Sequence, residues 1–330
     1  MKTFQFKDEP VIAIDTETTG LKWPDDEMFS FSVATKQTEQ YFDFRRDCNA
    51  LSWLRDELAQ FRGPIVFHNA SFDIKMLGSK GVNINLLKAR DTAIEACLID
   101  ENLPSYSLDF LAKKYLKESK QNEIYDELAK IFGGRATKNV QMSRVAQAPP
   151  EIVGPYANKD TRLTLDLWLK FQEIINEQEL HDIIAFEDEV FPSVIRSETR
   201  GVRVDINQAE QSLEMMRKRV DQHKDELRKL VGYELNVNSS PQIRKHFDPQ
   251  EKNDGSWWIR DKVKCGTTPT GNPSIDADTL LELSNYDPVA QKITEIRRDI
   301  RLGDTFLASH VLSSSSNGRV YPSINQDAGE

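Results

Sequence analysis

The chain has 330 residues, 38% of them hydrophobic and 29% charged, so it is long enough for two domains and has the composition of a soluble globular protein. Its three cysteines, Cys48, Cys97 and Cys265, lie far apart, which excludes a zinc ribbon and a disulfide framework and favours a reducing compartment. A formal net charge of −10 excludes a surface that is basic throughout, and composition alone favours no partner.

The first part of the chain predicts strands before helices. Residues 11–15 form an apolar run that ends in a carboxylate and precedes a turn, as expected of a buried strand. Alternating apolar and polar residues predict further strands over 29–35 and 39–44, and a short strand follows at 65–67. Helical patterns extend over residues 50–61, 69–79, 92–102 and 107–116. This order indicates a mixed α/β layer fold.

The middle and the second half of the chain are expected to be mostly helical. Residues 117–150 are polar and contain Gly-Gly and Pro-Pro pairs, so we expect a partly helical excursion outside the core. A helix follows from residue 151 to about residue 180, and the domain boundary is placed between residues 182 and 183. Further elements are expected as a helix over 208–231 ended by Gly232, a hairpin within 255–271 and a basic helix over 292–312.

Two short acidic pieces lie at the ends of predicted strands. Asp15 and Glu17 are two residues apart, so on an extended strand both side chains point to the same face. Asn69 is placed to cap a helix, and Asp73 lies one turn later on the same face. Taken alone, the first piece is better explained as a solvated strand end. The second is equally compatible with a capped helix whose early acid complements the helix dipole.

A third piece lies on one predicted helix. Tyr156 and Asp160 are four residues apart, so the phenol and the carboxylate emerge together, although a surface pair would have the same spacing. Phosphodiester hydrolysis needs an activated water, in-line geometry and neutralised charge on the leaving oxygen, which two divalent ions about 4 Å apart supply. Because Mg²⁺ and Mn²⁺ prefer carboxylate oxygens, the combined pieces predict a two-metal site built from Asp15, Glu17, Asp73 and Asp160.

These pieces resemble the three exonuclease motifs of the DEDD superfamily in its tyrosine branch, as Asp15-x-Glu17, Asn69-x-x-Phe72-Asp73 and Tyr156-x-x-x-Asp160. The resemblance implies a ribonuclease H-like fold with a mixed sheet over residues 1–182, and release of 5′-mononucleotides from a 3′ end. It assigns the tighter metal to the first-motif acids and Asp160, and the other metal, through water, to Asp73. Tyr156 is then expected to orient the attacking water without ionising.

A nucleic-acid strand would be held mainly by phosphate contacts and base stacking, because a proofreading enzyme must accept any sequence. The side chains expected to contact the strand are Thr16, Leu21, Asn69, Phe72, Arg135 and Lys138. Phe72 is better explained as a core residue, and each of the two basic residues is better explained as part of a solvated polar loop.

The second half resembles the entry and thumb of the polymerase module of family A DNA polymerases, particularly the phage replicative enzymes. The similarity is carried by residues 186–205, the segment Asn236-x-Asn238-Ser239-x-x-Gln242, and residues 274–283, 295–306 and 318–326. In the family, the palm aspartates and the nucleotide-binding helix of the fingers lie further along. We therefore expect no polymerase activity from this chain alone, which would be a fragment or one half of a split polymerase.

The leading hypothesis is a proofreading 3′→5′ exonuclease that acts on DNA with two Mg²⁺ or Mn²⁺ ions and is joined to a polymerase thumb. Its expected partners are a single-stranded 3′ end and primer-template DNA, with the missing polymerase half or a processivity factor as further candidates. No apolar run is long enough to cross a bilayer, so we expect a cytoplasmic protein, in the host cytoplasm if a phage encodes it. Two alternatives are an RNA-trimming exonuclease and a non-catalytic module that binds primer-template.

Overall fold

The computed structural model describes residues 4–120 and 123–326. The described residues divide into two compact units: those up to residue 201 with 321–326 form the first, and residues 202–320 form the second. From the sequence the boundary is expected between residues 182 and 183, whereas α8 (His181–Arg200) packs with the first unit. The difference arises because Phe191 and Ile195 on α8 are buried in the core of that unit.

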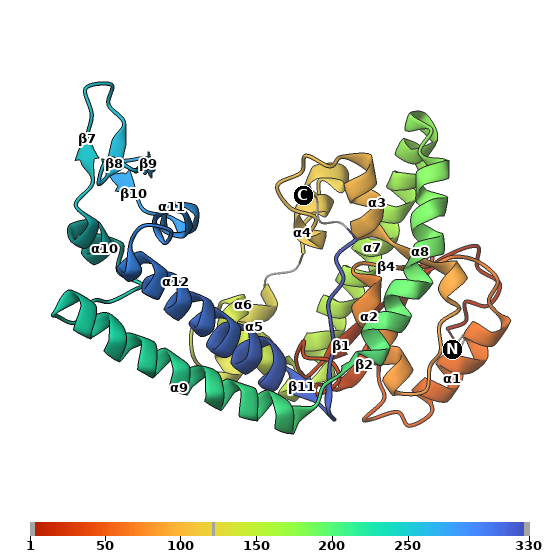
Figure 1. The fold of residues 1–330 in the computed structure, drawn as a ribbon. Helices are drawn as coiled ribbons and strands as arrows, with labels where there is room; N and C mark the ends of the chain where they lie inside the picture. The colour runs from red at the N-terminus through yellow and green to blue at the C-terminus, as the bar shows by residue number, and fades with distance from the viewer. Residues whose placement is uncertain (1–3, 121–122, 327–330) are drawn as a thin grey trace. The chain divides into compact units, whose positions relative to one another are not determined.

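The first unit is built on a five-stranded sheet with the strand order β3-β2-β1-β4-β5. Three of these strands, β1, β2 and β4, are labelled in Figure 1. The strands are β1 (Ile12–Thr18), β2 (Met28–Ala34), β3 (Glu39–Asp43), β4 (Ile65–Phe67) and β5 (Ala89–Asp91). β1, β2 and β3 pair antiparallel, whereas β1, β4 and β5 pair parallel. The sheet is therefore mixed, and the expected α/β fold class is confirmed.

Helices cover both faces of this sheet. The longest, α7 (Pro150–Gln178), crosses β1, β2 and β3 on one face. The others are α1 (Ala50–Gln60), α2 (Ala70–Ser79), the 3₁₀ turn η1 (Leu86–Lys88), α3 (Thr92–Ile99), α4 (Leu108–Leu111), the π-helical η2 (Ala112–Leu116), α5 (Glu123–Phe132), α6 (Lys138–Gln141) and the 3₁₀ helix η3 (Met142–Gln147). The expected helix over 107–116 is thus a short α-helix continued by a π-helical segment.

The central strand is buried on both faces, as expected where helices cover a sheet on each side. Ile12 and Ile14 belong to the largest core cluster, which includes side chains of α1, α2 and α8. Ala13, which alternates with them, packs with Leu165 of α7. This alternation decides which face each acidic residue further along β1 reaches.

The excursion over 117–150 is not entirely outside the core, so that expectation is wrong in part. Ile124 and Leu128, four residues apart on α5, are buried together with Val145 of η3. They form a small apolar cluster with Tyr156 of α7. The polar composition of the segment hides this stripe, because only one face of α5 is apolar.

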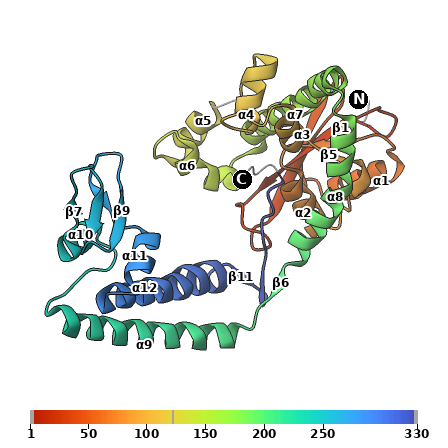
Figure 2. The same cartoon turned by 45° about the horizontal axis from the view of Figure 1, so that its top comes forward.

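The second unit is mostly helical, as expected (Figure 2). Its helices are α9 (Ile206–Val231), α10 (Ser240–Phe247), α11 (Ala277–Leu283), α12 (Pro288–Ile300) and the π-helical η4 (Arg301–Leu312). One sheet contains β7 (Gln250–Glu251), β8 (Trp257–Ile259), β9 (Val263–Thr267) and β10 (Pro273–Ser274). A second joins β6 (Val202–Arg203), β11 (Ser315–Ser316) and β12 (Arg319–Val320).

In the second unit, α9 and α12 lie side by side (Figures 1 and 2). The Arg219 guanidinium on α9 donates to both carboxylate oxygens of the buried Asp299, at 2.5 and 2.7 Å. The predicted Gly232 cap of α9 is confirmed, with a φ of 80° and an N–H that donates to Arg228. Among the residues that the structure describes, no helix combines the length and apolar character needed to cross a membrane.

Candidate active site

Alternation along β1 sends neighbouring side chains to opposite faces of the sheet. Ala13 packs on the α7 side of the sheet and Ile14 on the α2 side. By alternation, Asp15 and Glu17 therefore point to the same face as Ala13, and Thr16 points to the same face as Ile14. Glu17 and Thr16 are buried, and Asp15 is half-buried. The sequence expectation that the two acids share a face agrees with this arrangement.

Thr16 holds Asp73, which lies in the first turn of α2. The N–H and the hydroxyl of Thr16 both donate to Oδ1 of Asp73, at distances of 2.9 and 2.5 Å. Burial raises the pKa of Asp73 to about 7, although both hydrogen bonds favour the ionised carboxylate. The orientation of this second-motif acid is therefore set by the first-motif strand.

The third motif reaches the same region from α7. Ser32 of β2 links the strand to this helix. Its hydroxyl donates to the main-chain carbonyl of Ala157 at 3.1 Å and also contacts the Thr161 hydroxyl. Tyr156 and Asp160 lie one turn apart beside this attachment, and both are buried. Burial, followed by the charges of Asp160 and Glu17, raises the pKa of Tyr156 far above its ordinary value, so its hydroxyl stays protonated.

The start of α2 is capped by Asp91 rather than by the Asn69 side chain. Asn69 occupies the N-cap position with a φ of 68°, but its side chain makes no capping hydrogen bond, so the expected side-chain cap is wrong. Instead the Asp91 carboxylate accepts from the N–H groups of Asn69 and Ala70, at 2.9 and 2.7 Å. Asp91 also caps its own helix, α3, by accepting from the N–H of Ala93 at 2.9 Å.

Lys120 is a site residue that sequence reasoning missed. Its ammonium forms an ion pair with Asp160 and lies 5.5 Å from the centre of the Tyr156 ring. Burial opposes the charge of Lys120, but attraction to Asp160, Asp15 and Glu17 outweighs burial and raises its pKa. The residue belongs to no motif or periodic pattern, so the sequence carries no signal for it.

The acidic residues of the three motifs act on one another electrostatically. Burial, followed by repulsion from Asp73, Glu17 and Asp160, raises the pKa of Asp15 well above its ordinary value. Burial and the charge of Asp160 raise the pKa of Glu17 to about 8. Burial also raises the pKa of Asp160 despite the opposing charge of Lys120. These mutual effects indicate that the motif carboxylates lie within electrostatic range of one another. That they form one metal-binding site stays a prediction.

The donor chemistry of this cluster suits hard divalent cations, which prefer carboxylate oxygens. Oδ1 of Asp160 is buried and finds no hydrogen-bond partner among the described residues, so it remains available as a ligand. In the described part of the chain, no three acidic, histidine or cysteine side chains are already arranged as a metal centre. The ligand types in this cluster therefore suit divalent metal ions. In the described residues, the side chains are not grouped closely enough to form a complete metal centre.

A family model described as a 3′-5′ exonuclease, that of family A DNA polymerases, matches residues 4–176 of the 330, just over half of the chain. The chain belongs to this family. All five motif residues that carry the predicted chemistry fall within the matched range, which we call the exonuclease-family region.

Curated relatives of this exonuclease-family chain include phage DNA polymerases. The DNA polymerase DpoZ of Vibrio phage phiVC8 is 44% identical over 97% of this chain and 52% of its own length. The DpoZ polymerase of Salmonella phage PMBT28 is 42% identical over 97% of the chain and 51% of its own length. The chain thus spans about half the length of these relatives.

The fold of most of this chain is similar to that of a family A polymerase structure. The POL domain of Pol1 from M. smegmatis, in complex with DNA primer-template and dNTP, has a TM-score of 0.69 and covers 96% of this chain. That match extends over 49% of the Pol1 domain at 18% identity, so it supports the fold alone.

The residues expected to contact a nucleic-acid strand differ in their exposure and in the contacts they already make. The Thr16 hydroxyl is committed to Asp73, and Phe72 packs partly buried against the core, which is the alternative left open from the sequence. Leu21, in the loop after β1, is 83% exposed.

The three polar candidates, Asn69, Arg135 and Lys138, are all exposed. The charge of Lys138 is one of the influences that lower the pKa of Asp160, so Lys138 acts on the carboxylate cluster across space. Contact of these residues with a strand stays a prediction.

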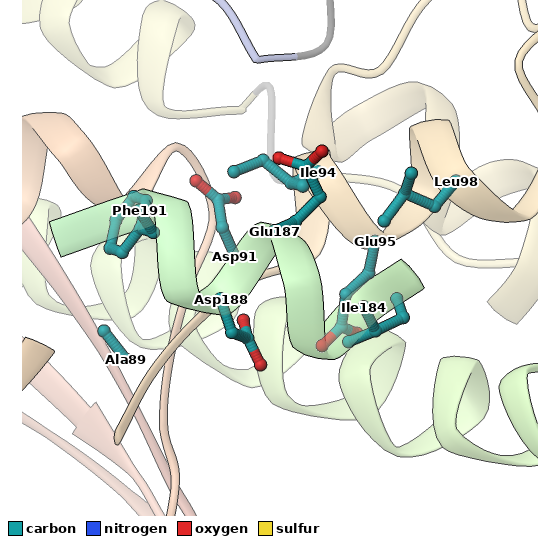
Figure 3. A pocket seen from close by; sticks show the side chains of 9 residues that line it. All are labelled: Ala89, Asp91, Ile94, Glu95, Leu98, Ile184, Glu187, Asp188 and Phe191. Carbon is teal, nitrogen blue, oxygen red and sulfur yellow. The ribbon is translucent and has the colours of Figure 1, made fainter. Parts of the chain in front are cut away.

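A second acidic pocket, in the first unit, is too small for a substrate. It lies between α8 and the segment running from the end of β5 into α3, and its carboxylates are Asp91, Glu95, Glu187 and Asp188 (Figure 3). Its cavity volume of about 10 Å³ holds at most one water molecule. Burial, followed by repulsion from Asp188, raises the pKa of Glu95 to about 8. This pocket bears on stability rather than on substrate binding.

Proposed function

We propose that this chain hydrolyses DNA phosphodiesters from the 3′ end by a two-metal mechanism and proofreads for a family A DNA polymerase. The observation that carries the proposal is the gathering of acids from three separate segments, β1, α2 and α7, beside a buried protonated tyrosine. Membership of the 3′-5′ exonuclease family supports the polarity. DNA as substrate is supported by phage relatives that are named DNA polymerases.

The proposed metal ligands are Asp15, Glu17 and Asp160 for one ion, with Asp73 acting through water on the other. When bound, two divalent ions supply an activated water and neutralise charge on the leaving oxygen. Thr16 keeps the Asp73 carboxylate in a fixed orientation through two hydrogen bonds. Tyr156 keeps its proton and orients the attacking water as a hydrogen-bond donor.

The second unit is proposed to hold primer-template DNA as part of a polymerase thumb. Its fold matches that of a polymerase domain whose structure contains a DNA primer-template. The chain spans about half the length of the phage relatives. A polymerase segment like that of the longer relatives and a processivity factor are further partners in this proposal.

The proposal is tested by digesting a 5′-labelled single-stranded DNA with Mg²⁺ or Mn²⁺. The wild type is compared with Asp15→Ala/Glu17→Ala, and Asp56→Ala, an exposed acid on α1, serves as the surface control. We expect a ladder that shortens from the 3′ end for the wild type and the control, and no ladder for the double variant or with EDTA. A 3′-labelled oligonucleotide that releases its label at once as mononucleotide confirms the polarity.

Two results would redirect the assignment. Digestion of an RNA oligonucleotide of the same sequence at an equal or greater rate would favour the RNA-trimming alternative. A folded wild-type chain that binds labelled DNA in an anisotropy titration but yields no ladder with either metal would identify a binding module. The first outcome contradicts the proposal because the proposal names DNA as the substrate of preference, and the second because the proposal requires metal-dependent hydrolysis.

A further inference from the structure

A cationic pocket lies on the first unit, away from the carboxylate cluster. It is a cavity of about 370 Å³ between the C-terminal half of α1, the start of β4 and the loop that follows α2. β4 and β5 run parallel, and the pocket includes Ile65 at the start of β4 and Lys88 just before β5. Asn69 follows β4 and Asp91 is the last residue of β5, so the pocket lies at the start of these parallel strands and the start of α2 lies at their other end.

Among the residues that the structure describes, three cations line this pocket and no carboxylate does. Arg55 and Arg62 come from α1 and the turn after it, and Lys88 comes from η1. In the described part of the chain, each of the three donates only to main-chain carbonyls: Arg55 to Lys80 at 3.5 Å, Arg62 to Ala59 at 3.2 Å and Lys88 to Phe61 at 2.9 Å. Carbonyl oxygens accept these hydrogen bonds but do not neutralise the charge. The composition is unusual here, because acidic residues outnumber basic ones by 53 to 43 in the whole chain.

The backbone beside Arg55 leaves room for its guanidinium. Gly81 has a φ of +75°, and a Cβ at this position would lie 3.3 Å from Nη1 of Arg55. Any other residue would therefore be strained and would crowd the cation. The side chains of Asn83 and Asn85 add neutral polar groups at the same rim.

The floor of the pocket is apolar. Leu58, Phe61 and Ile65 line it on the side of α1 and β4, and Val82 and Ile84 line it on the side of the loop. A pocket that combines an apolar floor with a few charged groups, at a volume of about 300–1,000 Å³, is typical of a small-ligand site. Guanidinium groups pair with phosphate through two parallel hydrogen bonds, and lysine binds phosphate as a point charge.

We propose that this pocket binds a phosphate monoester of nucleotide size, with the phosphate between Arg55, Arg62 and Lys88 and the organic body against the apolar floor. The site is separate from the proposed active site, so ligand binding here requires neither divalent metal nor hydrolysis. The exposed position of both arginines leaves the phosphate accessible from solvent.

The test is calorimetric titration of the full chain with deoxyadenosine 5′-monophosphate in EDTA. The background is Asp15→Ala/Glu17→Ala, which prevents the nucleotide from binding through metal at the proposed active site. Arg55→Gln/Arg62→Gln removes two pocket charges, and Lys36→Gln/Arg46→Gln, at exposed positions outside the pocket, removes two others as a matched control. Deoxyadenosine and inorganic phosphate are titrated separately into the background chain.

We expect saturable binding of the nucleotide, weakened about tenfold or more by Arg55→Gln/Arg62→Gln and unchanged by the control. Deoxyadenosine is expected to bind at least about tenfold more weakly than the nucleotide, and this comparison needs no pocket substitution. Equal affinity of Arg55→Gln/Arg62→Gln and of the control for the nucleotide would overturn the proposal. So would equal affinity of the background chain for the nucleotide and the nucleoside. So would absence of nucleotide binding together with arginine-dependent binding of an acidic peptide, which would assign the surface to a protein partner.

Discussion

The Lys120 ammonium forms an ion pair with the Asp160 carboxylate, inside a cluster of acids that repel one another. The pair is largely buried, with the Asp160 side chain 5% exposed and the Lys120 side chain 25% exposed. Lys120 therefore offsets part of the negative charge that three motifs bring to one place. Without it, the pKa values of Asp160, Glu17 and Asp15 would rise further, because Lys120 lowers each of them.

Replacing Lys120 with methionine is expected to destabilise the metal-free chain by about 2 kcal/mol at pH 8. Removing one partner of a buried pair costs several kcal/mol, and uptake of a proton by Asp160 limits the loss. Added Mg²⁺ should raise the melting temperature of the variant more than that of the wild type, because the bound cation then replaces the missing lysine charge. Thermal unfolding with and without Mg²⁺ measures both effects.

Lys130→Met is the matched control, since Lys130 is an exposed lysine paired with Glu127 on α5. Surface pairs of this kind contribute at most about 1 kcal/mol. If Lys120→Met and Lys130→Met gained equally from Mg²⁺, Lys120 would have no special relation to the carboxylate cluster.

Replacing Thr16 with valine is expected to reduce exonuclease activity about tenfold at pH 7 and to move the acidic limb of the pH–rate profile upward by about one unit. Valine removes the hydroxyl that donates to ionised Asp73, so the pKa of Asp73 rises further above its ordinary value from about 7. A smaller fraction of the carboxylate is then ionised at neutral pH. Activity should recover as the pH is raised.

Thr16→Ser keeps the hydroxyl and is expected to retain the wild-type profile. A uniform loss of activity at every pH in Thr16→Val would instead indicate displaced packing on β1. In that case the hydrogen bond to Asp73 would not control the ionisation of this acid.

Local spacing explains what could be predicted of the candidate site. Asp15 and Glu17 share a face because strand side chains alternate, and Tyr156 and Asp160 share a face because they are one helical turn apart. The positions of β1 to β4 along the chain could be predicted by similar local rules, since alternating and apolar runs mark them. Their order in the sheet could not be predicted in this way. These rules need only a few neighbouring residues, so one sequence was sufficient.

Contacts between distant segments could not be predicted in the same way. Asp91 caps α2 although it follows a different strand, and Lys120 reaches Asp160 from a polar segment without any periodic pattern. The amphipathic α8 could equally have packed on the second unit, because its apolar stripe does not say which core buries it. Tertiary packing decides each of these, and no local rule contains that information.

Replacing Asp91 with alanine is expected to destabilise the first unit by about 2–3 kcal/mol. The carboxylate accepts from the first N–H groups of two helices, and each lost capping bond costs about 1 kcal/mol. Loss of the α2 cap should also lower exonuclease activity, because Asp73 lies in the first turn of that helix. Urea unfolding followed by circular dichroism measures the loss of stability.

Asp91→Asn provides the graded comparison. Its amide oxygen can still accept the bonds from Asn69 and Ala93 that Oδ1 accepts, so it should lose less stability than Asp91→Ala. Equal stability of the alanine variant and the wild type, within about 0.5 kcal/mol, would show that the capping bonds are replaced by water.

The stability of Glu95→Gln relative to the wild type is expected to be greater at pH 8 than at pH 5. Glu95 is 3% exposed, and burial with repulsion from Asp188 raises its folded-state pKa from 4.5 to about 8. The folded chain therefore keeps a proton that the unfolded chain releases, and the stability that this proton contributes is lost as the pH rises from about 4.5 to 8. Glutamine carries no such proton, so this loss is absent from the variant.

The stability difference between Glu95→Gln and the wild type should grow by roughly 3 kcal/mol between pH 5 and pH 8. Urea unfolding at the two pH values measures this change, and using the change removes any constant effect of the substitution on packing. The Trp168 indole, which donates to Glu95 at 3.1 Å, can donate to the glutamine oxygen in the same way. Glu173→Gln, at an exposed position on α7, should show no growth with pH. A constant difference for Glu95→Gln would mean that Glu95 is ionised in the folded chain at both pH values, with water or Arg90 compensating its charge.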